Sequence, residues 1–245
     1  MLSDEKFCEQ AMKFALVSDT EGQFFKLDDY KKLIEGNQTD KDGNLVYLYA
    51  TDKEAQYSYI KAANDKGYNV LMMDGQLDIP FVSMLEQKNE KSRFVRVDSD
   101  VIDNLIRKED DKKSELSADE QAMASTLFKS QIPAIEKSEF YVSFAALAAT
   151  DQPVVITQSE YMRRMKEMAQ FQSGMNFYGE LPNAYNLTLN TNHPVVKKVI
   201  EAANSSLEGE LKPVNDELKA TNSVIEAIKS LDKDGKGVPE DKKAD

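Results

Sequence analysis

The amino-acid sequence predicts an α/β unit followed by a mixed α+β unit, with a charged linker between them. In residues 1–106, helix-like and strand-like stretches alternate, which is the pattern of a sheet covered by helices. Residues 107–117 are mostly charged or small, so they cannot bury enough surface to stay packed. We therefore expect domains over 1–106 and 118–231, a linker over 107–117 and a polar tail over 232–245.

The first half contains two strands that we expect to be buried on both faces. Residues 45–49 and 69–73 are nearly continuous apolar runs, as in the middle of a parallel sheet. A helix that ends near Gly67 separates them, so the three elements predict a βαβ unit. Three more helices are expected over 7–15, 27–34 and 79–87, and a more exposed strand over 93–97.

The second half mixes helices with short strands. Helices are expected over 118–130, 159–172 and 194–203, and strands over 139–147, 154–156 and 185–189. The helix over 159–172 is strongly amphipathic, with its basic and acidic residues opposite an apolar stripe. The stripe consists of Tyr161, Met162, Met165, Met168 and Ala169. Such a stripe is either core packing or a binding face, since thioether side chains repack easily around different shapes.

The composition restricts the classes of partner. The chain has 245 residues, 41% of them hydrophobic, and a formal charge of -12, so nucleic acid and anionic lipid would repel it. No apolar run approaches the roughly 20 residues that a membrane-spanning helix needs. The single cysteine, Cys8, cannot form an internal disulfide, and the N-terminus lacks the pattern of a secretory signal. We expect a cytoplasmic protein that binds neither nucleic acid nor a membrane.

No pattern of catalytic residues stands out. No glycine-rich phosphate loop follows a strand. His193 is the only histidine, so zinc sites with several imidazoles and hydrolase triads both lack parts. Cys8 lies on an apolar helix face, where a buried thiol is inert. The segments 40–43 and 232–235 match calcium loops only in part, and turns explain them. We expect no catalytic residue, no metal ligand and no bound cofactor.

Several motifs resemble the heat shock protein 90 family. The end of its middle domain is similar to QYSYI at 56–60, GYNVL at 67–71 and DGQLD at 74–78. The C-terminal domain of its bacterial form is similar to SEYMRRMKEM at 159–168 and LTLNTNHP at 187–194. These motifs occur in the family's order. The resemblance extends over residues 5 to about 230, with the charged linker between its two parts.

The resemblance implies part of an ATP-driven, homodimeric protein-folding chaperone. It implies a small three-layer αβα end of the middle domain, followed by a truncated α+β C-terminal domain. The family's ATPase domain is absent from this chain, so the resemblance gives it no catalytic residue, and ATP would act elsewhere in the intact protein. The last helices, which form the family's dimer interface, are also absent. We therefore expect a monomer or a weak dimer.

The same resemblance assigns a role to the amphipathic helix. In the bacterial chaperones this helix offers apolar side chains to unfolded polypeptide, and Tyr161, Met162, Met165 and Met168 occupy it here. Two alternatives stay open. One is a flavodoxin-like enzyme domain that binds a nucleotide, although residues 50–54 place acidic side chains where phosphates would lie. The other is a structural spacer that contacts no unfolded client protein.

Limited proteolysis tests the predicted linker. We expect the first cuts between Lys108 and Ala118, because this stretch is charged and lacks the apolar side chains that would hold its backbone against a core. Mass spectrometry of the earliest fragments locates these cuts. First cuts within residues 45–97 would contradict the boundary.

Overall fold

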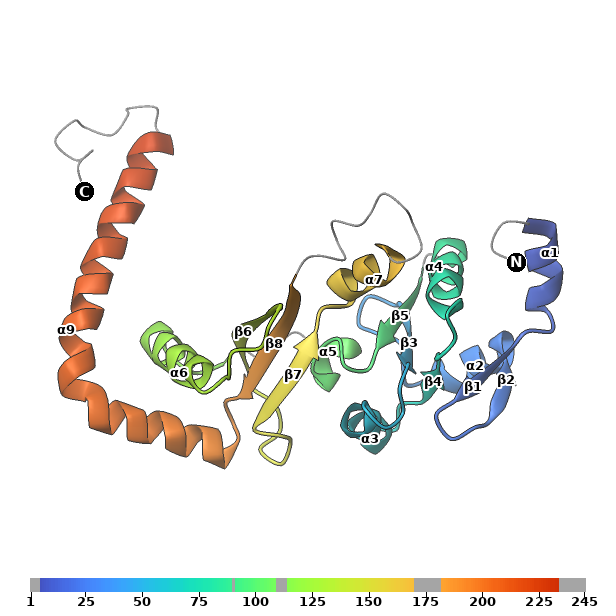
Figure 1. The fold of residues 1–245 in the computed structure, drawn as a ribbon, viewed down its shortest axis with the longest axis horizontal. Helices are drawn as coiled ribbons and strands as arrows, with labels where there is room; N and C mark the ends of the chain where they lie inside the picture. Colours follow the sequence, from blue (N-terminus) through green and yellow to red (C-terminus); the bar gives the residue numbers. More distant parts are fainter. Residues whose placement is uncertain (1–4, 90, 109–113, 170–181, 234–245) are drawn as a thin grey trace.

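The computed structural model describes residues 5–89, 91–108, 114–169 and 182–233. Within them the chain forms two sheets, one in each half (Figure 1), with strand orders β2-β1-β4-β3-β5 and β6-β8-β7. This mixed architecture confirms the predicted fold class. The domain boundaries stay a prediction, since residues 109–113 of the expected linker and 234–245 of the expected tail lie outside the described residues.

Strand β3 (Leu45–Ala50) is the centre of the first sheet. β4 (Val70–Met72) and β5 (Ser92–Arg96) run parallel to it on either side. All of β3 is buried, as its nearly continuous apolar run predicted. An antiparallel hairpin of β1 (Leu16–Asp19) and β2 (Phe24–Lys26) extends the sheet beyond β4. The sequence did not predict this hairpin, because strands of three or four residues show no clear period.

Helices cover both faces of the first sheet. α2 (Leu27–Ile34) and α4 (Asp78–Lys88) pack on one face, and α3 (Tyr57–Asp65) and α5 (Ile102–Leu105) on the other. Odd-numbered residues of β3 contact the first pair of helices and even-numbered residues the second, because successive side chains of a strand point to opposite faces. The first half is therefore the three-layer αβα arrangement that the family resemblance implied.

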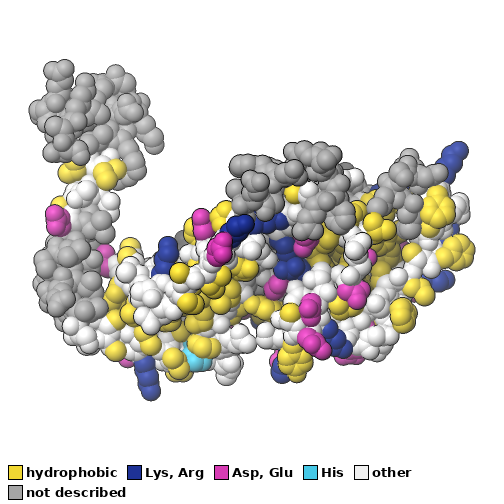
Figure 2. Space-filling model, in the orientation of Figure 1, with side chains coloured by type: hydrophobic (Ala, Val, Ile, Leu, Met, Phe, Trp, Pro, Cys, Tyr) yellow, Lys and Arg dark blue, Asp and Glu magenta, His cyan; other side chains and the backbone are white. Residues whose placement is uncertain are grey.

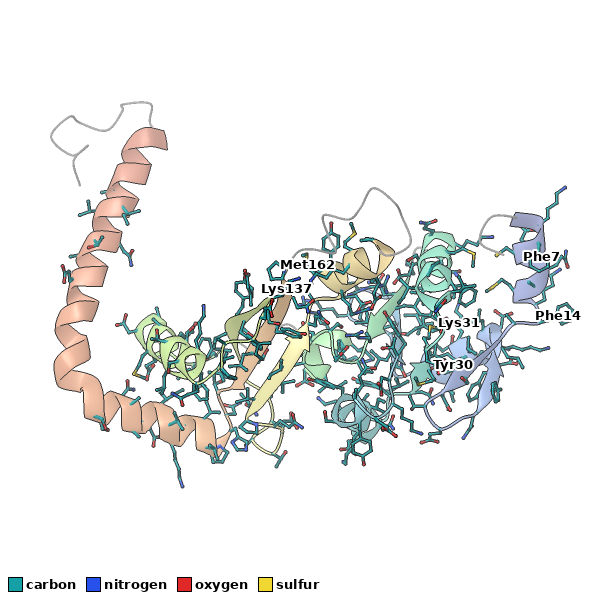
Figure 3. The ribbon with its side chains drawn as sticks, viewed as in Figure 1. Phe7, Phe14, Tyr30, Lys31, Lys137 and Met162 are labelled. Carbon is teal, nitrogen blue, oxygen red and sulfur yellow. The ribbon has the colours of Figure 1, made fainter. Side chains whose placement is uncertain are left out.

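The first helix is shorter than predicted. α1 (Glu5–Met12) ends before Phe14, because the chain turns there to enter β1. Phe7 and Phe14 are both exposed (Figure 3), so the expected apolar face over 7–15 is wrong at these two positions. Cys8 is buried, as predicted, and its Sγ lies 3.3 Å from the Sδ of Met84.

The second sheet has a helical layer on one face. β8 (Asn183–Asn190) lies between β6 (Ser138–Ala145), which is parallel to it, and β7 (Val154–Gln158), which is antiparallel. α6 (Ala118–Ser130) and the start of α9 (Pro194–Lys233) cover this sheet. The core between them consists of buried apolar side chains from α6, β8 and α9: Ala124, Leu187, Leu189, Val196 and Ile200.

Helix α9 is much longer than predicted. The sequence indicated a helix over 194–203 and a polar tail from 232, but α9 continues to Lys233. The prediction failed because the apolar residues beyond 203 are sparse, whereas Leu, Glu, Lys and Ala favour a helix without any core contact. Figure 1 shows that α9 bends and extends away from the two sheets. Among the described residues, no helix is long and apolar enough to cross a membrane.

Gly67 provides a test of this fold. It ends α3 with a φ of 74°, a region that favours glycine, and a Cβ there would lie 3.3 Å from the Nδ2 of Asn37. We predict that Gly67→Ala lowers the free energy of unfolding in urea by about 1–2 kcal/mol. The control is Gly36→Ala, where a Cβ meets open space. Equal losses in both variants would contradict the strain at Gly67.

Candidate functional site

Helix α7 (Glu160–Ala169) carries the apolar stripe, and β7 brings it to the edge of the first sheet. The amide of Gln158, at the end of β7, donates to the carbonyl oxygen of Asp98 at 3.0 Å. The hydroxyl of Tyr59, on α3, donates to the carbonyl oxygen of Ile156. These two hydrogen bonds join β7 to the first half of the chain, and α7 follows directly beside α4 (Figure 1).

The charged side of α7 faces the protein interior. Arg163 is only 4% exposed, and the side chains of Glu160 and Arg164 are also mostly covered. An amphipathic helix of a globular protein normally buries its apolar side and leaves the charged side in water. In α7 the charged side is also covered, so its contacts help to determine where the helix lies.

The carboxylate of Glu160 is the centre of these contacts. Its Oε1 accepts hydrogen bonds from the Tyr49 hydroxyl at 2.9 Å, from Arg163 at 2.6 Å and from the Nε of Arg164 at 2.6 Å. Its Oε2 accepts one from the backbone amide of Arg96 at 3.2 Å. Tyr49 lies on β3 and Arg96 on β5, so one side chain of α7 binds two strands of the first sheet.

Further carboxylates balance the arginines. Arg164 donates to Glu86 on α4 at 2.6 Å, and Arg163 donates to both oxygens of Glu167 at 2.6 Å. Glu167 also lies 3.8 Å from the guanidinium of Arg96. Every arginine here thus has a carboxylate within ion-pair distance, as charges taken out of water require. We call this set the anchor network: Tyr49, Glu86, Arg96, Glu160, Arg163, Arg164 and Glu167.

The anchor network also covers the outer edge of β5, which is the last strand of the first sheet. The amide of Phe94 donates to Glu86 at 2.7 Å, and its carbonyl oxygen accepts from Arg164. The amide of Arg96 donates to Glu160. Unpaired backbone groups at a sheet edge can pair with a strand of another chain. At β5, side chains from α4 and α7 satisfy these groups instead.

The protonation states fit this geometry. Burial raises the pKa of Glu160, but the nearby Arg163 and Arg164 outweigh it and hold the pKa below its ordinary value of 4.5. Burial and the charge of Glu160 both raise the pKa of Tyr49 above its ordinary value of 10.0. At neutral pH, Glu160 is therefore ionised and the Tyr49 hydroxyl keeps the proton that it donates.

The apolar stripe lies on the other side of α7. Tyr161 is 66% exposed, Met162 and Met165 are partly exposed, and neither methionine belongs to a core cluster of the described residues. Ala169 is buried. Met168 lies on the same helix, but its side chain is outside the described residues. The structure thus places Tyr161, Met162 and Met165 on one helix with their side chains at least partly exposed, and Figure 3 labels Met162.

The comparisons with known proteins agree with the sequence motifs. A chaperone protein HtpG of Bacteroides thetaiotaomicron is 53% identical over 96% of this chain and 35% of its own length. One of Bacteroides fragilis is 56% identical over 87% of the chain, and one of Porphyromonas gingivalis is 55% identical over 86%. The chain belongs to the HtpG family. It spans only 31–35% of the length of these relatives, and no family model matches it.

HtpG is the bacterial form of heat shock protein 90, so the resemblance seen in the motifs is confirmed. Hydrophobic periodicity predicted the stripe of this HtpG segment but not its anchor. A sequence pattern was present, because Glu160, Arg163, Arg164 and Glu167 are spaced three and four residues apart. It gave no sign of Tyr49, which lies in an apolar strand more than one hundred residues earlier.

The anchor predicts a loss of stability in Glu160→Gln. Without this charge, Arg163 and Arg164 keep only Glu167 and Glu86, and breaking a buried ion pair typically costs about 3–5 kcal/mol. We expect a loss at pH 7 near the lower end of this range, measured by urea denaturation. The control is Glu139→Gln on an exposed part of β6, with an expected change of about 0.5 kcal/mol or less.

The pH dependence gives a second readout of the same variant. Because the pKa of Glu160 is lower in the folded state than its ordinary value of 4.5, its contribution is fully present above pH 4.5. That contribution disappears as the pH falls through the folded-state pKa. Melting temperatures between pH 7 and pH 3 should therefore fall less steeply in Glu160→Gln than in the original protein. Parallel curves would show that Glu160 is not the charged centre of the anchor.

Proposed function

We propose that this chain is the part of an HtpG chaperone that holds unfolded client polypeptides, and that it assists folding without a catalytic site of its own. The names of its relatives support the chaperone class. The observation that carries the proposal is the orientation of α7, which is bound to the protein through its charged side. The apolar side is thereby left available for a client.

The spacing of residues on α7 explains how one helix serves both purposes. At about 100° per residue, the anchoring positions 160, 163, 164 and 167 fall on one arc of the helix. Positions 161, 162 and 165 lie about 100° to 200° around the helix from position 160, and position 168 lies between them and position 164. A client bound there contacts tyrosine and methionine, side chains that provide apolar area and, in methionine, adapt easily to different shapes. The proposed client-binding residues are therefore Tyr161, Met162, Met165 and Met168.

The remaining parts of the proposal follow from the family. ATP binding and hydrolysis belong to another part of a homodimeric HtpG protein that acts in the cytoplasm. The contacts after β3 support the absence of a nucleotide here. The side chain of Gln56 accepts hydrogen bonds from the amides of Thr51 at 2.8 Å and Asp52 at 3.0 Å. A flavodoxin-like site would need free backbone amides in this loop.

Two charge substitutions test the client surface. We expect Met162→Glu and Met165→Glu to weaken binding of a reduced, carboxymethylated protein that cannot refold by about tenfold or more, measured by fluorescence anisotropy. Since both side chains are partly exposed, the free energy of unfolding should change by only about 0.5 kcal/mol. The control is Leu33→Glu, at an apolar position on α2 that is more exposed than the two methionines.

Two other results would each replace the proposal. A loss of several kcal/mol in both methionine variants would mean that the stripe is core, since burying an unpaired carboxylate is costly. Unchanged stability together with unchanged binding would mean that the segment is a structural spacer.

A further inference from the structure

Strand β6 has an outer edge that no described strand covers. It is the last strand of the second sheet, and its only strand partner there is β8. At the corresponding edge of the first sheet, side chains of the anchor network form hydrogen bonds with the backbone of β5. The second sheet therefore offers backbone groups where the first has covered them.

The register of β6 identifies these groups. The carbonyl oxygens of Lys137 and Ala145 accept from the amides of Asn183 and Thr191, at 2.8 and 2.9 Å, on the β8 side. Because backbone groups alternate in direction along a parallel strand, the odd-numbered residues between them also face β8. The backbone groups of the even-numbered residues Phe140, Val142 and Phe144 consequently point outward. Among the described residues, these outward groups form no backbone hydrogen bond.

A cavity of about 410 Å³ lies at the start of this edge. Its walls come from the end of α6, the connection after it and the first residues of β6. Apolar lining is supplied by Ile132, Pro133, Ile135, Phe140 and Tyr141. Ile135 is 51% exposed, and hydrophobic side chains are visible on the surface over β6 and β8 (Figure 2). The cavity is large enough to take one or two apolar side chains of a partner.

Two hydrogen bonds link α7 to the start of β6, where the cavity lies. Lys166 of α7 donates to the side chain of Asn183 at 2.7 Å, and the amide of Asn183 donates to Lys137. Lys137 directly precedes Ser138, which lines the cavity. Figure 3 shows Met162 and Lys137 at the same end of the second sheet.

We propose that an extended client segment pairs with the outer edge of β6 and places an apolar side chain in the cavity beside Ile135. This inference rests on the proposed function and adds the mode of recognition. Backbone pairing is independent of sequence, which suits a partner with many different sequences. Alternate side chains of the added strand point the same way, so one apolar residue reaches the cavity while its neighbours stay in water. Unfolded polypeptide supplies both features.

Hydrogen exchange at single amides tests the pairing. The probe is an acetylated nine-residue peptide with isoleucine at alternate positions, threonine between them and lysine at both ends. Its binding should slow exchange at the outward amides of Val142 and Phe144 by about tenfold or more. The amides of Tyr141 and Ser143, already paired with β8, should change little and serve as the internal control. The same peptide with alternate amides N-methylated should bind about tenfold more weakly. Peptide binding without a change at Val142 and Phe144, or no binding, would overturn the inference.

Two substitutions separate this inference from the proposed function. Ile135→Glu should weaken binding of the nine-residue peptide by about tenfold, and Val195→Glu, at a similarly exposed apolar position on α9, should not. Both variants should keep the original melting temperature. One outcome is that Met162→Glu lowers binding of the carboxymethylated protein while Ile135→Glu changes the binding of neither the peptide nor that protein. This result would support the client surface on α7 and reject pairing at the edge of β6. The opposite pattern would reject the client surface on α7 and retain the edge.

Discussion

The position of α7 depends on one carboxylate, that of Glu160, held between two arginines and a tyrosine. A buried ion pair contributes little net stability, because the charges must first leave water. Its effect is on position, since any other arrangement would leave Arg163 or Glu160 buried without a partner. Tyr49 and the amide of Arg96 fix this carboxylate against β3 and β5. The second sheet is linked to the first through the same contacts, because α7 follows β7 directly.

The edge strands of the two sheets differ in how their outward backbone groups are covered. A strand edge is a risk for any protein, since its backbone groups can pair with other chains. Charged side chains cover β5, and the edge at β2 is a strand of only three residues. β6 has eight residues and an apolar cavity at its start. For the proposed binding of unfolded polypeptides, an edge that no described strand covers would be useful.

The sequence predicted well those features that depend on neighbouring residues. β3 was predicted from its continuous apolar run, and α6 has the bounds, residues 118–130, that the sequence predicted. The hairpin of β1 and β2 was missed because its strands are short. α9 was underestimated because its apolar residues are sparse beyond residue 203. Neither element shows a regular apolar period. The hairpin depends on the way the chain connects its two short strands, and α9 depends on helix propensity.

The candidate site also could be predicted only in part, because local sequence patterns do not reveal contacts between distant residues. Hydrophobic periodicity located Tyr161, Met162 and Met165 on one side of α7, but periodicity alone cannot say which side faces the protein. That choice depends on Tyr49 and Glu86, which come from distant parts of the chain. The anchor is a tertiary arrangement of ordinary charged residues. No local pattern distinguishes them from residues on a solvated helix face.

An anchor made of ion pairs also responds to heat differently from an apolar contact. The cost of removing charges from water falls as the temperature rises, because the hydration of ions carries an unfavourable entropy. The pairs of Glu160 with Arg163 and Arg164 therefore become less costly to maintain on heating. Under the same conditions other proteins begin to unfold and expose apolar segments. The helix proposed to receive those segments is thus held in place by ion pairs whose net free energy becomes more favourable as the temperature rises.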